Sequence, residues 1–149
     1  MLGRLKKRGS NEAIGKSKGG KTTKIHTTVD ALGNPLSFAL TGGEAHDLVG
    51  ADILLPGLNA DALIADKAYD ADSRVIEMLE KRGIEPVIPP RECRKNLRDY
   101  DKELYKARHL IENLFQKMKN FRAFATRYDK TARNFLAGVH LVAITVLLK

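Results

Sequence analysis

The spacing of apolar and β-branched residues changes along the chain, and this change limits the folds that the chain can adopt. Residues 22–41 place β-branched side chains on both sides of a turn signal, Gly33-Asn34-Pro35, which predicts a hairpin with strands at 22–30 and 36–41. After the hairpin come a short helix, a strand, a helix, a second strand and two closing helices. Two hairpin strands followed by alternating strands and helices are typical of an α/β fold.

The later elements are predicted from shorter signals. A short helix is expected near 47–55, and the apolar run that ends in Asp66 is typical of a buried strand. Residues 72–82 are expected to form a helix that ends at Gly83. The rest of the prediction is a strand at "EPVIPP", a basic loop at "RECRKNLR" and two closing helices at about 101–120 and about 130–148.

Composition favours one basic domain with a polyanionic partner. The 149 residues are 43% hydrophobic, which suffices for a packed core, and 26 Lys and Arg against 18 Asp and Glu give a net charge of +8. Nucleic acid is the first candidate partner and a membrane surface the second. Residues 1–21 hold many Lys, Arg and Gly, so we expect a flexible basic arm there and the folded domain over 22–149.

Other sequence features argue against secretion and membrane insertion. Cys93 is the only cysteine, so no internal disulfide can form, and we expect a reducing, cytoplasmic compartment. No apolar run follows the basic start of the chain, as a signal peptide would require. The most apolar tract, residues 135–148, is shorter than the roughly 20 residues of a membrane span, so we expect a buried helix there.

The stretch "ELYKARHLIENLFQKMKN", residues 103–120, aligns four polar side chains along one edge of a helix. At about 100° per residue, the four fall within about 60° of arc: Tyr105, Arg108, Glu112 and Lys119. They border an apolar stripe, so a carboxylate there would be held by packing and still be reachable. Helix geometry alone leaves two interpretations open, an ordinary Arg108–Glu112 surface pair and a functional site.

Asp66 is a second candidate site residue. It comes at the carboxyl end of a predicted strand, where α/β sheets place their ligands. The alternative is an aspartate that caps the following turn, which is common after strands. Asp66 and Glu112 together suggest a divalent-metal site, because Mg²⁺ usually takes one or two carboxylates with phosphate and water.

The sequence "GKSKGGKT", residues 15–22, offers a competing interpretation. It matches the pattern of a phosphate-binding loop, and "LIAD" resembles the aspartate-ending second motif of nucleotide-binding proteins. Such a loop needs a buried strand before it and a helix after it. A basic stretch precedes Gly15 and β-branched residues follow Lys21, so nucleotide binding stays a remote alternative.

The spacing Y-x2-R-x3-E-x6-K in the 103–120 helix resembles the signature of insertion-sequence DDE transposases of families four and five. Further blocks resemble the same group in the same order: "GKSKGGKTTKIHTTVDALGNPL", "TGGEAHD", "LIADKAYDAD", "VIPPR", "YDKELYKARHLIENLFQKMKNFR" and "ATRYDKTARNF". The resemblance covers nearly the whole chain from about residue 15.

The resemblance implies an RNase H-like mixed sheet with flanking helices, and Mg²⁺- or Mn²⁺-dependent DNA cleavage and strand transfer. Asp66 and Glu112 would be two of the three catalytic, metal-binding carboxylates. Three further residues would contact DNA phosphates near the cut: Tyr105, Arg108 and Lys119. The implied partners are transposon-end and target DNA, with a second copy of the chain or an upstream transposase segment.

One departure from the family concerns its first catalytic aspartate, which lies on the first, central strand upstream of "GKSKGG". Nothing before Gly15 fits, and the available substitutes are Asp30 at the hairpin turn and Asp47 after "TGGEAH". We therefore expect the C-terminal catalytic part of a transposase without its first strand, inactive alone. It would be a second reading frame or a decayed copy; the alternative is a non-catalytic DNA-binding or inhibitory product.

Overall fold

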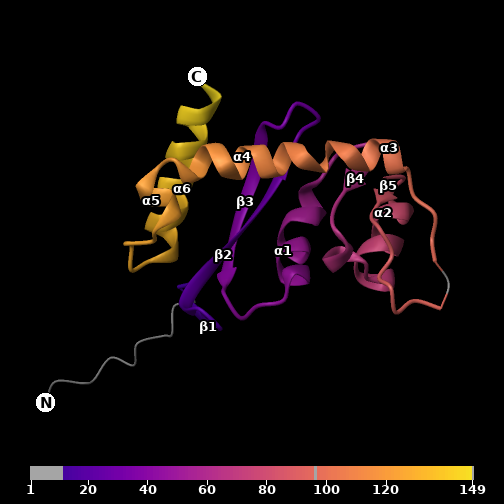
Figure 1. Cartoon of the computed structure of the whole chain (residues 1–149), viewed down its shortest axis with the longest axis horizontal. Coiled ribbons are helices and arrows are strands. Elements are labelled where there is room, and N and C mark those ends of the chain that lie inside the picture. The colour runs from indigo at the N-terminus through magenta and orange to yellow at the C-terminus, as the bar shows by residue number, and fades with distance from the viewer. Residues whose placement is uncertain (1–11, 96, 149) are drawn as a thin grey trace, which may run out of the picture.

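The strands of the chain form two small sheets (Figure 1). In the computed structural model, which describes residues 12–95 and 97–148, an antiparallel sheet has the order β1–β2–β3 and a parallel pair joins β4 to β5. The strands are β1 (Gly15–Ser17), β2 (Gly20–Val29), β3 (Pro35–Gly42), β4 (Ala62–Ile64) and β5 (Glu85–Val87). With its helices the chain is a mixed α/β structure, as its sequence predicts.

Helical segments follow and connect the strands. The α-helices are α1 (Asp47–Leu54), α2 (Glu77–Lys81), α3 (Lys102–Tyr105), α4 (His109–Lys119), α5 (Arg122–Ala125) and α6 (Ala132–Leu147). Three short 3₁₀ turns are η1 (Leu55–Gly57), η2 (Lys67–Tyr69) and η4 (Lys106–Arg108), and η3 (Asp72–Ile76) is a single π-helical turn. Because α3, η4 and α4 follow one another without a break, the predicted helix at about 101–120 is confirmed.

The β2–β3 hairpin forms as predicted, and Asp30 closes its turn. Oδ1 of Asp30 accepts hydrogen bonds from the backbone N–H groups of Leu32 and Asn34, both at 2.9 Å. Gly33 adopts a φ of +84°, which a residue without a Cβ does at low cost. Local turn chemistry therefore sets the register that pairs His26 with Ala39.

The predicted basic arm is too long, because part of it forms a strand pair. β1 pairs with the start of β2, and Oγ1 of Thr22 donates to Oγ of Ser17 at 3.0 Å across this pair. Gly20, with a φ of +103°, allows the turn between the two strands. The motif "GKSKGGKT" is thus a hairpin followed by more strand, which a phosphate-binding loop is not. Residues 1–11 of the predicted arm lie outside the described residues.

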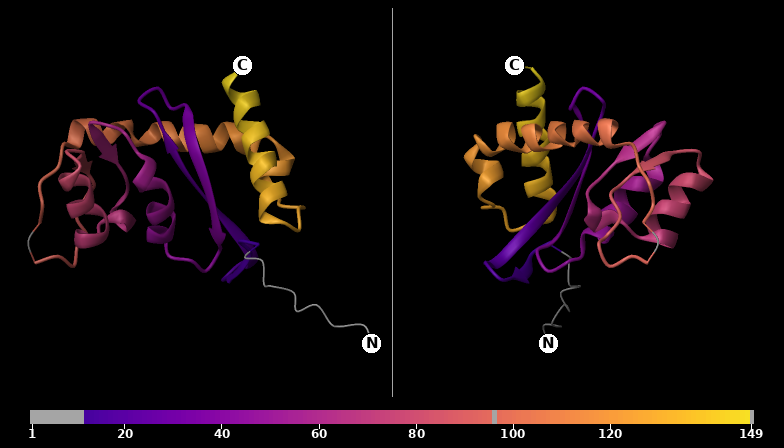
Figure 2. Two further views of the ribbon diagram at one scale, coloured as in Figure 1. Left: turned by 180° about the vertical axis from the view of Figure 1, so that it is seen from behind. Right: turned by 45° about the vertical axis from the view of Figure 1, so that its right-hand side comes forward.

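Two apolar clusters hold the elements together. One joins α1, η1, η3, α2 and the residues on either side of β5, and its buried members are Ala51, Leu55, Val75, Ile76, Leu79, Ile84 and Ile88. The other packs α4, α5 and α6 against the hairpin and has as its buried members Leu114, Met118, Phe124, Phe135, Val139, Val142 and Ala143. The continuous helical run from α3 to α4 connects the two regions: α3 lies beside α2 and β5, and the end of α4 lies beside α5 and α6 (Figure 2).

β4 is less buried than its apolar sequence predicts. All three of its residues are only partly buried, whereas Val87 of the neighbouring β5 is fully buried. Within the described residues β4 pairs with β5 alone, so its other edge has no strand partner. This edge explains the difference, because the prediction assumed a strand inside a sheet.

The apolar tract near the C-terminus forms α6, which packs on the hairpin. Its buried residues are Phe135, Val139, Val142 and Ala143. Among the helices of residues 12–95 and 97–148, none has the length and apolar character of a membrane span.

Candidate functional site

Arg108 and Glu112 form a salt bridge on the exposed side of the long helical run. Nη2 of Arg108 donates to Oε1 of Glu112 at 2.5 Å, one helical turn away. The two side chains are 35% and 52% exposed, so solvent screens the pair and it stabilises the helix by a few tenths of a kcal/mol at most. A weak, accessible pair of this kind can open when a stronger ligand reaches either partner.

An open groove lies beside this pair, between α4, β2 and α5. Its volume is about 730 Å³, and Glu112 and Lys119 contribute its charged groups. The other lining residues are Thr23, Ile25, Phe115, Gln116, Phe124 and Ala125. The groove therefore combines an apolar wall with a carboxylate and an ammonium, which can take a ligand that has both an apolar part and a charge.

Tyr105 lies at the other end of the helical run. Its ring meets that of Tyr100 edge-on, with centroids 5.5 Å apart. Tyr105 also lies close enough to Lys67 to affect its pKa, which is raised mainly by the hydrogen bond and charge of Glu92. About four helical turns, or about 21 Å, separate Tyr105 from Lys119 along the axis. The four aligned residues thus do not form one compact cluster.

Asp66 caps the turn that follows β4, as its structural interpretation predicts. Its Oδ1 accepts a hydrogen bond from the backbone N–H of Ala68 at 2.8 Å, at the start of η2. Asp66 is only partly buried, and the cap is the one hydrogen bond that its side chain makes with described residues. The second carboxylate oxygen is therefore free to bind a ligand.

The two predicted carboxylates lie on different elements, and no hydrogen bond or ion pair of the described residues links them. Glu112 pairs with Arg108, and Asp66 with its own turn. Within residues 12–95 and 97–148, no group of three or more His, Cys, Asp or Glu side chains is placed to hold a metal ion. The donors are of the type that Mg²⁺ prefers, but the described residues do not gather enough of them.

The two substitutes for a missing aspartate have structural partners. The partly buried Asp30 serves the hairpin turn, where hydrogen bonds from Asn34 lower its pKa. Asp47, at the start of α1, pairs with Nζ of Lys24 at 3.0 Å. Burial raises the pKa of Tyr69 to about 12, with additions from Asp47 and Asp66, so these two carboxylates face a common neighbour. Of the two substitutes, Asp47 is therefore the one near the Asp66 turn.

Asp70 was not predicted from the sequence, and it is the one charged side chain among the buried polar residues that the structure describes. It is 3% exposed and receives arginines from the loop at residues 91–98, which was expected only to be basic. Burial alone would raise the pKa of Asp70, but hydrogen bonds from Arg94 and Arg91 and the charges of Arg94 and Arg98 outweigh it and lower the pKa. The arginine spacing of three to four residues was the only available signal.

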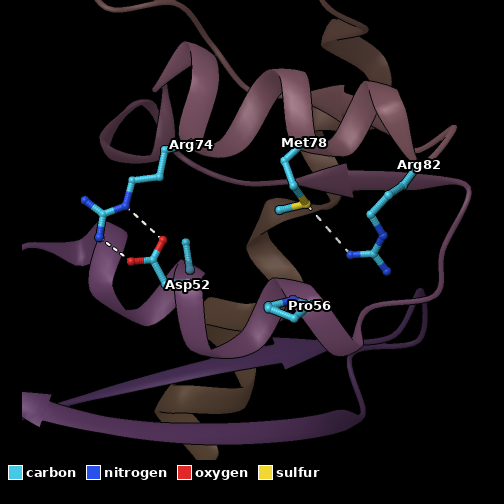
Figure 3. Close-up of a pocket in the computed structure, with 6 residues that line it drawn as sticks. Asp52, Pro56, Arg74, Met78 and Arg82 are labelled. Carbon is cyan, nitrogen blue, oxygen red and sulfur yellow. Dashed lines mark hydrogen bonds and ion pairs between the residues drawn. The ribbon is translucent and has the colours of Figure 1, made fainter.

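A second cavity, of about 410 Å³, separates α1 from α2 (Figure 3). Its charged groups are paired: Nε of Arg74 donates to Asp52 at 2.8 Å, and Nη1 of Arg82 donates to the carbonyl of Leu55 at 2.5 Å. None of the five predicted site residues lines it. This cavity therefore lies where α1 and α2 meet, and it shares no lining residue with the groove beside α4.

Comparison with known proteins gives matches over most of the chain. The sequence model of a family described as Transposase DDE domain matches residues 4–148. A protein of Brucella ovis, which carries the name of a transposase for insertion sequence element IS6501, is 38% identical over 129 residues, 86% of this chain and 99% of that protein. One of Burkholderia cepacia, named for element IS402 in the same way, is 31% identical over 122 residues, 74% of this chain and 55% of that protein. No solved structure matches significantly.

Proposed function

The chain belongs to the Transposase DDE domain family, and we propose that it is the catalytic part of an insertion-sequence transposase that cleaves DNA and transfers strands with a divalent metal. The observation that carries the proposal is that Glu112 and Lys119 line one groove and that Arg108 is paired with Glu112. An ammonium and a guanidinium next to an accessible carboxylate suit a phosphodiester that must be held close to a metal ligand.

Arg108 and Lys119 are proposed to bind DNA phosphates. When a phosphate approaches, Arg108 can exchange the single hydrogen bond to Glu112 for a paired contact with two phosphate oxygens, which a planar guanidinium favours. This exchange also frees Glu112. Because about 21 Å separate Tyr105 from Lys119, the two would contact different phosphates of the strand.

Asp66 and Glu112 are proposed as ligands of Mg²⁺ or Mn²⁺. Their oxygens have the hardness that these ions require, and the second oxygen of Asp66 is free. The described residues hold no group of three metal-binding side chains, so a further carboxylate would come from another segment. Such ions, when bound, neutralise charge on the phosphate that reacts. This chain would supply the side chains that bind the phosphate and two of the carboxylates that bind the metal.

The separate sheets support a role for a further strand. β2 pairs with β3 along one edge, but on its other edge it pairs with β1 only as far as Thr22. Within the described residues β4 has a partner on one edge only. We propose that a strand from an upstream transposase segment, carrying the third carboxylate, lies between β2 and β4. In this arrangement the RNase H-like sheet would be continuous.

The proposed function is tested by nicking of transposon-end DNA with Mn²⁺, using the full chain fused to the upstream segment. We expect nicking that is lost in Glu112→Gln and Asp66→Asn, with retained folding checked by circular dichroism. The matched control is Glu103→Gln, because Glu103 forms a similar exposed pair with Lys106 on the same helical run, away from the groove. Nicking that survives both site substitutions would refute the assignment.

A second candidate function is DNA binding without catalysis. It is favoured by the net charge of +8 and by the absence, within the described residues, of a group of side chains that could hold a metal. A product of this kind would inhibit transposition by occupying transposon ends. The same assay separates the two, because the second function predicts binding of the DNA with no nicking in any fusion.

A further inference from the structure

Asp70 lies four residues after Asp66 and accepts hydrogen bonds from three arginines of the 91–98 loop. Its Oδ2 accepts hydrogen bonds from Nε of Arg94 at 2.5 Å and from the backbone N–H of Arg91 at 2.8 Å. Its Oδ1 accepts a longer one from Nη2 of Arg98, at 3.3 Å. The carboxylate is shielded from water, and these donors replace the water that it has lost. Asp70 is thus the common acceptor that fixes the conformation of the loop.

Arg91 extends this anchor to the turn that carries Asp66. Its Nε donates to the carbonyl of Lys67 at 3.1 Å, and its Nη2 donates to the carbonyl of Ala68 at 2.8 Å. Both carbonyls belong to η2, whose first turn Asp66 caps through the N–H of Ala68. The guanidinium of Arg91 and the carboxylate of Asp66 therefore bind the same short stretch of backbone, Arg91 through its carbonyls and Asp66 through an N–H.

The other two arginines tie the loop to neighbouring elements. Nη2 of Arg98 also donates to the carbonyl of Ile88 at 2.9 Å, directly after β5. Nη1 of Arg94 pairs with Asp72 at 2.6 Å, at the start of η3. Without Asp70, the guanidinium groups of Arg94 and Arg98 would repel each other, and the backbone N–H of Arg91 would lose its acceptor. The network consequently fixes the backbone on both sides of the Asp66 turn.

We propose that Asp70 and Arg91 are positioning residues for Asp66, which they hold in one orientation through the backbone of η2. This inference rests on the proposed role of Asp66 as a metal ligand. Residues that orient a metal ligand change metal affinity by about 10- to 100-fold when they are removed. The arginines of the 91–98 loop accordingly form hydrogen bonds within the protein.

The first test is hydrogen–deuterium exchange of the full chain without metal. The Arg91→Lys variant keeps the charge but loses the two-pronged contact, and Asp70→Asn removes the anchor. In both we expect the amides of Tyr69 and Asp70 to exchange at least about tenfold faster, while the amides of α6 keep their native rates. Unchanged exchange at the turn in both variants, or equal acceleration in α6, would overturn the positioning role.

Asp52→Asn is the matched control. It removes the same charge from another Asp–Arg pair, the one with Arg74 beside the second cavity (Figure 3). Exchange at the turn should stay native in this variant. If Asp52→Asn accelerates the turn as much as Asp70→Asn does, the effect is a general loss of stability and the proposal is wrong.

The second test is titration with Mn²⁺ of the full chain fused to the upstream segment, because that segment is proposed to supply the third carboxylate. We expect Arg91→Lys to weaken Mn²⁺ binding by about tenfold, Asp66→Asn to abolish it and Asp52→Asn to leave it unchanged. Native affinity in Arg91→Lys would overturn the inference. If Asp66→Asn binds Mn²⁺ like the native chain, the proposed metal role of Asp66 fails, and the exchange experiment still decides whether Arg91 positions the turn.

Discussion

Lys119 is the groove residue through which phosphate binding can be measured most directly. It is exposed, and it forms no ion pair with any described residue. We predict that Lys119→Gln weakens DNA binding to a similar degree for all sequences and lowers the slope of log K against log salt by about one, because one phosphate contact is lost. Lys117→Gln is the control, since Lys117 is also exposed on the same helix but does not line the groove. Equal slopes for the two variants would contradict the assignment.

His26 makes the stability of the chain depend on pH. It is 6% exposed and bonded through Nε2 to Oγ1 of Thr41 at 2.8 Å. Burial lowers its pKa below 6.5; the charge of Asp47 opposes this shift and that of Lys24 adds to it. As pH falls below about 6.5, the unfolded chain takes up the proton first, so the free energy of unfolding decreases until the folded-state pKa is reached.

The measurement for His26 is urea denaturation between about pH 7.5 and about pH 5. Replacement of His26 by Gln should flatten the pH dependence in this range, while the same change at the exposed His109 should leave it as in the native chain. A native pH dependence in the His26→Gln variant would show that another group is responsible.

At the scale of elements, two glycines in helices should respond to alanine in opposite directions. Gly50 brings α1 against β2, and a Cβ there would lie 2.2 Å from Nδ1 of His26, so Gly50→Ala should destabilise the fold by about 1–3 kcal/mol. In α6 a Cβ at Gly138 would meet nothing within 4 Å, so Gly138→Ala should stabilise the helix by about 0.5–1 kcal/mol. Thermal melting of both variants is the check; a stabilising Gly50→Ala would mean that α1 does not pack this closely.

The same scale shows which elements can be predicted from sequence. The β2–β3 hairpin is predictable because Asp30, Gly33 and Asn34 form its turn locally, and the helical run of residues 102–119 because its apolar residues recur with the helical period. Local chemistry also predicts that Asp66 caps a turn. These elements, and the alignment of Glu112 with Lys119 on one side of the helical run, can therefore be predicted from local sequence.

Features that depend on distant residues could not be predicted in this way. Asp70 is buried only because arginines 21 to 28 residues later fold back on it, and no local pattern announces this. β1 depends on pairing across a glycine turn within a stretch whose composition favours disorder. β4 is more exposed than its apolar sequence predicts. Its burial depends on how many strands pair with it, and composition does not reveal that number.

At the scale of the whole molecule, the two sheets leave edges that invite association. The edge of β2 beyond Thr22 and one edge of β4 present backbone groups without strand partners among the described residues, and such edges pair with other chains. We predict that the full chain alone self-associates and melts at low temperature. Fusion to an upstream transposase segment that contains the proposed strand should make it monomeric and raise Tm, because one added strand pairs both edges. Sedimentation and thermal melting measure the two effects, with a segment of equal composition and scrambled order as the control. A chain that is monomeric alone, and whose Tm neither fusion changes, would mean that no strand is missing between β2 and β4.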